Sequence, residues 1–193
     1  MSLREDTATR ILDVAEKLVQ TGGFNGFSYA DVAGEVRVRK ASLHHHFATK
    51  SQLGTRLISR YQERFMGVLA AIEQGGSSPA EQLERYVAIY AGVLKKNRMC
   101  LCGILAAEYA TLPKPMRDGV TRFFAANEGW LASLLERGRK SGDLVFAGSP
   151  LETSRFVVAS LEGAMLVARA QRDFSRFQSA ASHLQSMLVA RRH

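Results

Sequence analysis

Residues 36–60 read VRVRKASLHHHFATKSQLGTRLISR, and this stretch decides which fold the sequence is expected to adopt. It holds six arginines or lysines and no aspartate or glutamate. Small and polar side chains stand among them, including Ala41, Ser42 and three histidines that begin at His44. Arginine and lysine neutralise phosphates, while serine and histidine can bond either phosphates or base edges. The stretch therefore predicts a short basic helix suited to the major groove of DNA.

The residues on either side of the basic helix predict a helix-turn-helix unit. Ser28 and Asp31 form a capping-box pattern, which indicates a short helix over residues 29–36. The basic helix follows after a tight turn and is expected to cover residues 39–47. Two short helices joined in this way, the second one basic, are typical of a unit whose second helix enters the major groove.

Two longer helices are expected to hold this unit in place. The first covers about residues 7–20 and ends at a pair of glycines, and the fourth runs from residue 50 to about residue 73. The small core of the N-terminal domain is predicted to consist of Phe24, Phe27, Val32, Ala33, Val36, Leu43, Phe47 and Leu53.

The clearest break in the sequence is the run GGSSP at residues 75–79, after which the apolar segments become longer. Apolar residues recur at helical spacing almost throughout, so we expect an all-α protein of about nine helices. We place a DNA-binding domain at residues 4–64, with its helix-turn-helix at about 27–46, and a second domain at residues 65–193. The further helices are expected at about residues 79–97, 101–112, 114–140, 150–172 and 174–191.

Charge and cysteine content limit the class of protein. The formal net charge of +8 fits a polyanionic partner, and all six acids of residues 1–60 lie at or before Glu35, so positive charge gathers in the stretch quoted above. Without a secretory pattern or a sufficiently long apolar run, the protein is expected to be cytoplasmic, with no membrane partner. Cys100 and Cys102 are interpreted as reduced, apolar thiols, and a redox sensor is the alternative.

The second domain is predicted to bind a small molecule. Aromatic and flexible apolar side chains occur along its helices, and Glu108 and the tyrosines could supply polar anchors, although most of these residues are also what a plain core needs. The candidate pocket residues are Tyr86, Tyr90, Cys102, Glu108, Tyr109, Phe123, Trp130, Phe156 and Met165.

The last two helices are predicted to form a dimer interface, because they combine apolar stripes with small residues that allow close packing. The candidate interface residues are Phe156, Ser160, Gly163, Ala164, Leu184 and Leu188.

Catalysis and metal binding are not expected. Consecutive histidines on a helix point about 100° apart, so residues 44–46 cannot converge on one ion. The sequence has no glycine-rich phosphate loop and no evident nucleophile with its base. A cofactor is therefore not predicted, and an enzyme or carrier built on a helical bundle is the disfavoured alternative.

The sequence resembles the TetR family of bacterial transcriptional regulators over about residues 4–64. The matching residues are Arg10-Ile11-Leu12, Ala15, Gly22-Gly23-Phe24, Phe27-Ser28, Asp31-Val32-Ala33, Val38, Lys40-Ala41-Ser42-Leu43, His45-His46-Phe47, Lys50 and Leu53. A less specific likeness to the C-terminal domain of one branch of the family covers Cys102-Gly103, Ala106-Ala107-Glu108, Arg117, Phe123 and Gly142-Asp143-Leu144.

The resemblance implies roles for particular residues. Ser28 and Tyr29 would contact phosphate at the start of the second helix, and Lys50 would do so from the fourth. His44 replaces a tyrosine that touches phosphate in the family, so its contact should strengthen in mildly acidic solution, where imidazole gains a proton. The residues at or near base edges would be Arg39, Lys40, Ala41, Ser42 and His45.

The resemblance also implies a regulator that binds a palindromic double-stranded operator as a homodimer and responds to a small-molecule effector. Release of DNA by the effector is the expected sign, so the protein would be a repressor. An activator of the same family is the alternative.

Overall fold

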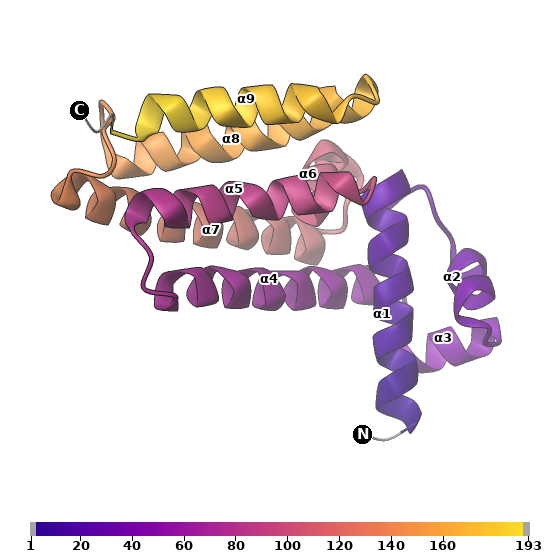
Figure 1. Ribbon diagram of the computed structural model, residues 1–193. Helices are drawn as coiled ribbons and strands as arrows, with labels where there is room; N and C mark the ends of the chain where they lie inside the picture. Colours follow the sequence, from indigo (N-terminus) through magenta and orange to yellow (C-terminus); the bar gives the residue numbers. More distant parts are fainter. Residues whose placement is uncertain (1–2, 191–193) are drawn as a thin grey trace. The chain divides into compact units, whose positions relative to one another are not determined.

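The computed structural model describes residues 3–190, and the chain is helical through most of them (Figure 1). The elements are α1 (Leu3–Gly22), α2 (Tyr29–Val36), α3 (Lys40–His46), α4 (Lys50–Gln74), α5 (Pro79–Lys95), α6 (Leu101–Ala107), η1 (Tyr109–Thr111), α7 (Lys114–Ser141), α8 (Pro150–Ala170) and α9 (Phe174–Leu188). The prediction of an all-α fold with about nine helices is confirmed. The residue at which the last helix was predicted to end, Arg191, lies outside the described part.

Local sequence signals explain where the long helices begin. Ser78 and Ser149 each cap a helix and form a capping box with the acid three residues later. Pro79 and Pro150 occupy the first helical position, where a missing N–H costs nothing. These pairs fix the starts of α5 and α8 at the predicted residues.

One predicted helix is interrupted. Residues 101–112 were expected to form a single helix, but α6 ends at Ala107 and the 3₁₀ turn η1 follows. The turn is tight because the amide of Glu108 donates to the carbonyl of Leu105, three residues back, and the Thr111 hydroxyl donates to the Glu108 carbonyl.

The helices gather into two compact units. The first contains the residues up to Glu63 together with Leu101–Phe123, and the second contains Arg64–Cys100 and the residues from Phe124 onward. In the first unit, all eight predicted core residues are buried, and Val32, Leu43 and Leu53 are fully inaccessible to solvent. The prediction of that core is therefore confirmed.

In the second unit, α8 and α9 lie side by side along most of their length (Figure 1). Val157, Leu161 and Phe177 are among the residues buried there. An isolated bridge pairs Leu144 with Val189, and the amide of Val145 donates to the carbonyl of Leu188 at 2.8 Å. Within residues 3–190, no helix is long and apolar enough to cross a bilayer.

Candidate DNA-binding site and buried polar cluster

The helix-turn-helix is built by caps at both ends of α2. Ser28 accepts a hydrogen bond from the amide of Asp31, and the Asp31 carboxylate accepts from the Ser28 amide at 2.7 Å. At the other end Arg37 adopts a left-handed conformation, with φ 60°, which turns the chain toward α3. The guanidinium of Arg10 donates to the Val36 carbonyl at 2.8 Å. These contacts set the entry and exit of the chain around α2.

The inward face of α3 is held by one buried side chain and by one buried hydrogen bond just after the helix. Leu43 is fully buried, and the hydroxyl of Tyr29 donates to the carbonyl of Phe47 at 2.8 Å. Burial raises the pKa of Tyr29 to about 12. The side chain of Tyr29 is thus engaged inside the protein, and a phosphate contact at this position would have to come from its backbone amide.

The outward face of α3 carries most of the predicted DNA-contacting residues. Those exposed on this face and at its start are Arg39, Lys40, Ala41, His44 and His45, while Ser42 is half-buried. The ring of His44 lies 4.8 Å from that of Tyr29, and its Nδ1 is 3.2 Å from the Ala48 carbonyl oxygen. The exposed imidazole therefore lies against the Tyr29 ring and beside the Ala48 carbonyl, near the C-terminal end of α3.

The cations of residues 36–60 do not all face solvent. Arg60 is mostly buried and pairs with Asp13 at 2.7 Å and Glu16 at 3.2 Å. Arg56 approaches Glu63 at 3.9 Å. By contrast, no ion pair involves the exposed side chains of Arg37, Arg39 or Lys40 in the described part of the chain. Uncompensated positive charge is thus concentrated at the turn and at the start of α3.

Lys50 is turned inward. Its ammonium donates to the carbonyl of Phe27 and lies over the rings of Phe27 and Phe24, 4.2 and 4.7 Å from their centroids. Burial lowers the pKa of Lys50, and the carboxylates of Glu108 and Asp31 oppose that shift. The side chain therefore holds the loop before α2, and it would have to leave this position to reach a phosphate.

Glu108 lies in the first unit and binds the same loop. Its carboxylate accepts hydrogen bonds from the amides of Phe24 at 2.6 Å and Asn25 at 3.3 Å. Gly23 has φ 84°, and a Cβ atom there would lie 2.5 Å from the Glu108 Oε1. Both carboxylate oxygens of Glu108 therefore accept hydrogen bonds from this loop. For this reason we leave Glu108 out of the ligand pocket for which the sequence suggested it.

A buried group of hydrogen-bonding side chains lies in the second unit. Tyr86 donates to the Asn127 Oδ1 at 2.9 Å, the Asn127 amide donates to the Tyr90 hydroxyl at 2.9 Å, and the two hydroxyls are 3.1 Å apart. The indole of Trp130 stacks on the Tyr86 ring at 5.7 Å. Burial raises the pKa of both tyrosines, so they remain neutral. We call Tyr86, Tyr90, Asn127, Trp130 and Glu162 the polar cluster.

Two atoms of the polar cluster are buried without a partner. The Glu162 Oε1 and the Trp130 Nε1 make no hydrogen bond within the described part of the chain. Burial raises the pKa of Glu162 to about 7, although a hydrogen bond from Cys100 opposes the shift. Buried polar atoms are nearly always paired, so these two unpaired atoms call for an explanation, such as a contact with water or a ligand.

The remaining predicted pocket residues are dispersed. Met165 is buried in the second unit, whereas Cys102, Tyr109 and Phe123 belong to the first. Phe156 is 52% exposed on α8. Cys100 and Cys102 are both buried free thiols. Asn127 and Glu162 were missed by sequence analysis, because a lone polar residue in an apolar helix gives no sign of the partners it will meet.

The predicted interface residues of α8 and α9 separate into two sets. Ser160, Gly163 and Ala164 are half-buried along an open groove between these helices. Leu184 and Leu188, each 4% exposed, are already packed inside the second unit. A side chain buried in its own protomer offers no surface to a partner, so we leave these two leucines out of the interface.

Comparisons with known proteins assign the family. Residues 11–56 match the model described as "Bacterial regulatory proteins, tetR family", and residues 79–184 match "Tetracyclin repressor-like, C-terminal domain". The chain is 27% identical to the HTH-type transcriptional repressor NemR of Escherichia coli strain K12 over 192 residues, which cover 95% of this chain and 94% of that protein.

Solved structures agree with the sequence matches. A TetR-family regulator from Agrobacterium tumefaciens has 35% identity and a TM-score of 0.93, with 97% of this chain and 100% of that one covered. The reduced form of Escherichia coli NemR has 26% identity and a TM-score of 0.83, with 96% and 98% covered. The predicted resemblance is confirmed: the chain belongs to the TetR family of bacterial transcriptional regulators, and it is a DNA-binding regulator rather than an enzyme.

Proposed function

We propose that the protein is a repressor that binds a palindromic operator as a homodimer and releases it when a small molecule binds. The observation that carries this proposal is the uncompensated positive charge of Arg37, Arg39 and Lys40 beside the exposed face of α3. Cations without acidic partners are available to phosphates, whereas paired ones must first break an ion pair. The sign of regulation is supported by the relative NemR, which is named a transcriptional repressor. Its place of action would be the bacterial cytoplasm, where the DNA lies.

Base edges and phosphates would be contacted by different residues. Arg39, Lys40, Ala41, Ser42 and His45 surround the exposed face of α3, so we assign them to the bases or to phosphates at the groove edge. The phosphate contacts are assigned to Ser28, the amide of Tyr29, His44 and Lys50.

Dimerisation is proposed for the outer face of α8 and α9. Small residues line the groove between these helices, and large apolar side chains are exposed beside it: Phe156, Leu166, Val167 and Met187 are each between 52% and 54% accessible. Exposed apolar surface of this kind marks an interaction site. A two-fold dimer would present two α3 helices to half-sites one helical turn apart, about 34 to 36 Å.

The experiment that tests DNA recognition is selection of bound sequences from a random duplex pool at fixed salt. We expect enrichment of an inverted repeat. Lys40→Ala should change the preferred bases or lower affinity strongly, while Lys114→Ala, which removes the same charge from an exposed i,i+4 ion pair, should have little effect. Selection of no common sequence, or a single half-site without its repeat, would refute the dimeric operator model.

For the effector we propose the polar cluster of the second unit. The unpaired Glu162 Oε1 calls for a hydrogen-bond donor or a cationic amine, and the Trp130 Nε1 calls for an acceptor. The rings of Tyr86, Tyr90 and Trp130 suit an apolar or cationic body. Trp130 is the only tryptophan, so its fluorescence reports binding directly. Compounds that quench it should also release operator DNA, and Glu162→Gln should weaken both effects together.

The activator and redox alternatives stay predictions. No observation on the described residues favours activation over repression. For redox sensing, both thiols are buried, which limits access of an oxidant.

A further inference from the structure

The turn between α2 and α3 holds an arginine at a position where glycine is usual. Arg37 has φ 60° and ψ 49°, which is the left-handed conformation. In that conformation a Cβ atom lies too close to the following carbonyl oxygen, so helices commonly end on glycine there. An outlier of this kind supports a hypothesis of function for its side chain.

The turn does not need the Arg37 guanidinium for its own structure. The amide of Val38 donates to the carbonyl of Ala33 at 3.1 Å, so backbone groups close the turn. A cation at the end of a helix often binds the last carbonyls, but at α2 the guanidinium of Arg10 already donates to the Val36 carbonyl at 2.8 Å. Capping of α2 therefore does not explain the presence of an arginine at position 37.

The Arg37 side chain is exposed and has no protein partner. Its guanidinium makes no hydrogen bond, ion pair or ring contact with any residue of the described range 3–190. The acid two residues earlier, Glu35, is paired with Lys17 at 3.2 Å. Two residues later the exposed Arg39 begins α3 as its N-cap. Arg37 is thus a cation that can bind a phosphate without first losing an ion pair.

We propose that Arg37 binds a backbone phosphate of DNA from the turn in front of α3, a contact additional to those assigned above. The second helix of a helix-turn-helix places its first residues at the base edges, so the residue just before it lies beside the flanking backbone. A guanidinium binds a phosphate through two parallel, charge-assisted hydrogen bonds. The inference rests on the proposed binding of DNA through α3, and it does not depend on a palindromic operator or on an effector.

The test is fluorescence anisotropy of a labelled, random-sequence duplex titrated with the full chain between about 50 and 200 mM salt. Arg37→Gly removes the cation and suits the left-handed turn. It should lower the slope of log affinity against log salt by about 0.9 for each protomer bound, with roughly tenfold weaker binding at the lowest salt. Arg37→Lys keeps the charge and should keep the wild-type slope. An unchanged slope and affinity in Arg37→Gly would overturn the proposal.

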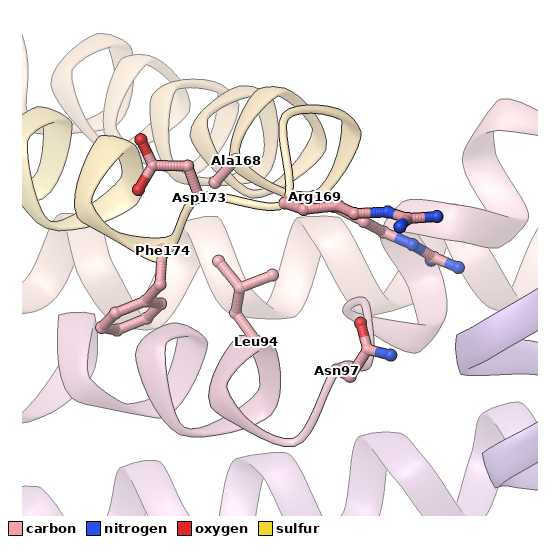
Figure 2. A pocket seen from close by; sticks show the side chains of 7 residues that line it. Leu94, Asn97, Ala168, Arg169, Asp173 and Phe174 are labelled. Carbon is pink, nitrogen blue, oxygen red and sulfur yellow. The ribbon is translucent and has the colours of Figure 1, made fainter.

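A matched control is available elsewhere on the chain. Arg172 has the same conformation, with φ 52°, in the turn after α8, and this turn borders the pocket drawn in Figure 2. Arg172→Gly makes the same change of charge and backbone outside the helix-turn-helix. Both glycine variants should melt no lower than the wild type, because glycine suits the left-handed conformation. Only Arg37→Gly should lose DNA affinity, and an equal loss in both would refute a contact at Arg37.

A third variant separates the cation from the stiffness of the turn. Arg37→Asn is neutral and tolerates the left-handed conformation, so it should weaken binding as much as Arg37→Gly does. Wild-type binding by Arg37→Asn would assign the loss in Arg37→Gly to a loosened turn and would overturn the proposal. No binding of duplex by the wild type would contradict DNA recognition and this contact together. Binding without an enriched inverted repeat would contradict the palindromic operator alone.

Discussion

Replacing Glu108 with glutamine tests whether a single carboxylate fixes the loop in front of the DNA-binding helices. In the wild type its two oxygens accept from the amides of Phe24 and Asn25, at 2.6 and 3.3 Å. Glutamine keeps the shape but has one carbonyl oxygen, so its NH₂ group must face the other amide. The variant therefore removes the negative charge from both contacts, keeps at most one neutral hydrogen bond and places two donors against each other.

The magnitude follows from those two contacts. A hydrogen bond to a charged group contributes about 1.5–3 kcal/mol, and the short, partly buried bond to Phe24 falls in that range. The longer, exposed bond to Asn25 adds little. A domain of this size shifts its melting temperature by about 2–4 °C per kcal/mol, so Glu108→Gln should melt about 3–12 °C below the wild type.

Thermal unfolding followed by circular dichroism at 222 nm measures this shift. Glu84→Gln is the matched control, because it makes the same change of charge at an exposed position of α5. A melting temperature for Glu108→Gln within about 1 °C of the wild type, or a drop equal to that of the control, would show that the loop does not depend on the carboxylate.

Three further predictions concern single side chains. Leu43→Ala, at the fully buried position of α3, should cost about 2–5 kcal/mol of unfolding free energy in denaturant titrations, and a loss below 1 kcal/mol would contradict the packing described. Tyr86→Phe leaves the buried Asn127 Oδ1 without its donor and should cost about 1–3 kcal/mol, whereas an unchanged denaturation midpoint would show that water replaces the hydroxyl. The pKa of Glu162 is raised to about 7 in the folded state, so its contribution to stability is fully present below the unfolded pKa of 4.5 and is lost as the pH rises through 7. Between pH 5 and 8 the wild type should lose of the order of 2–3 kcal/mol relative to Glu162→Gln, and parallel stability curves for the two proteins would refute the shift.

Features that depend on neighbouring residues could be predicted from the sequence. The bounds of α2 were predicted correctly, because the capping box at Ser28 and the following apolar spacing are local signals. The start of α5 was predicted correctly for the same reason, with Ser78 and Pro79 as the signals. The core of the first unit followed from helical periodicity.

Features that depend on contacts distant in the sequence could not be predicted. Arg60 was counted with the basic stretch, but its partners Asp13 and Glu16 lie more than 40 residues away. Glu108 was noticed as an acid in an apolar segment, yet the amides it binds are 83 and 84 residues distant. No periodic pattern relates such positions, so only the folded chain shows which cations remain free for DNA.

The first unit is made of two separate segments of the chain, and this constrains how the protein can be recombined with its relatives. The chain passes from one unit to the other after Glu63, after Cys100 and after Phe123. A hybrid regulator made by joining residues 1–64 to a foreign effector region would omit Leu101–Phe123, and with them Glu108. Engineers who wish to exchange effector specificity should therefore graft residues 101–123 together with the N-terminal segment.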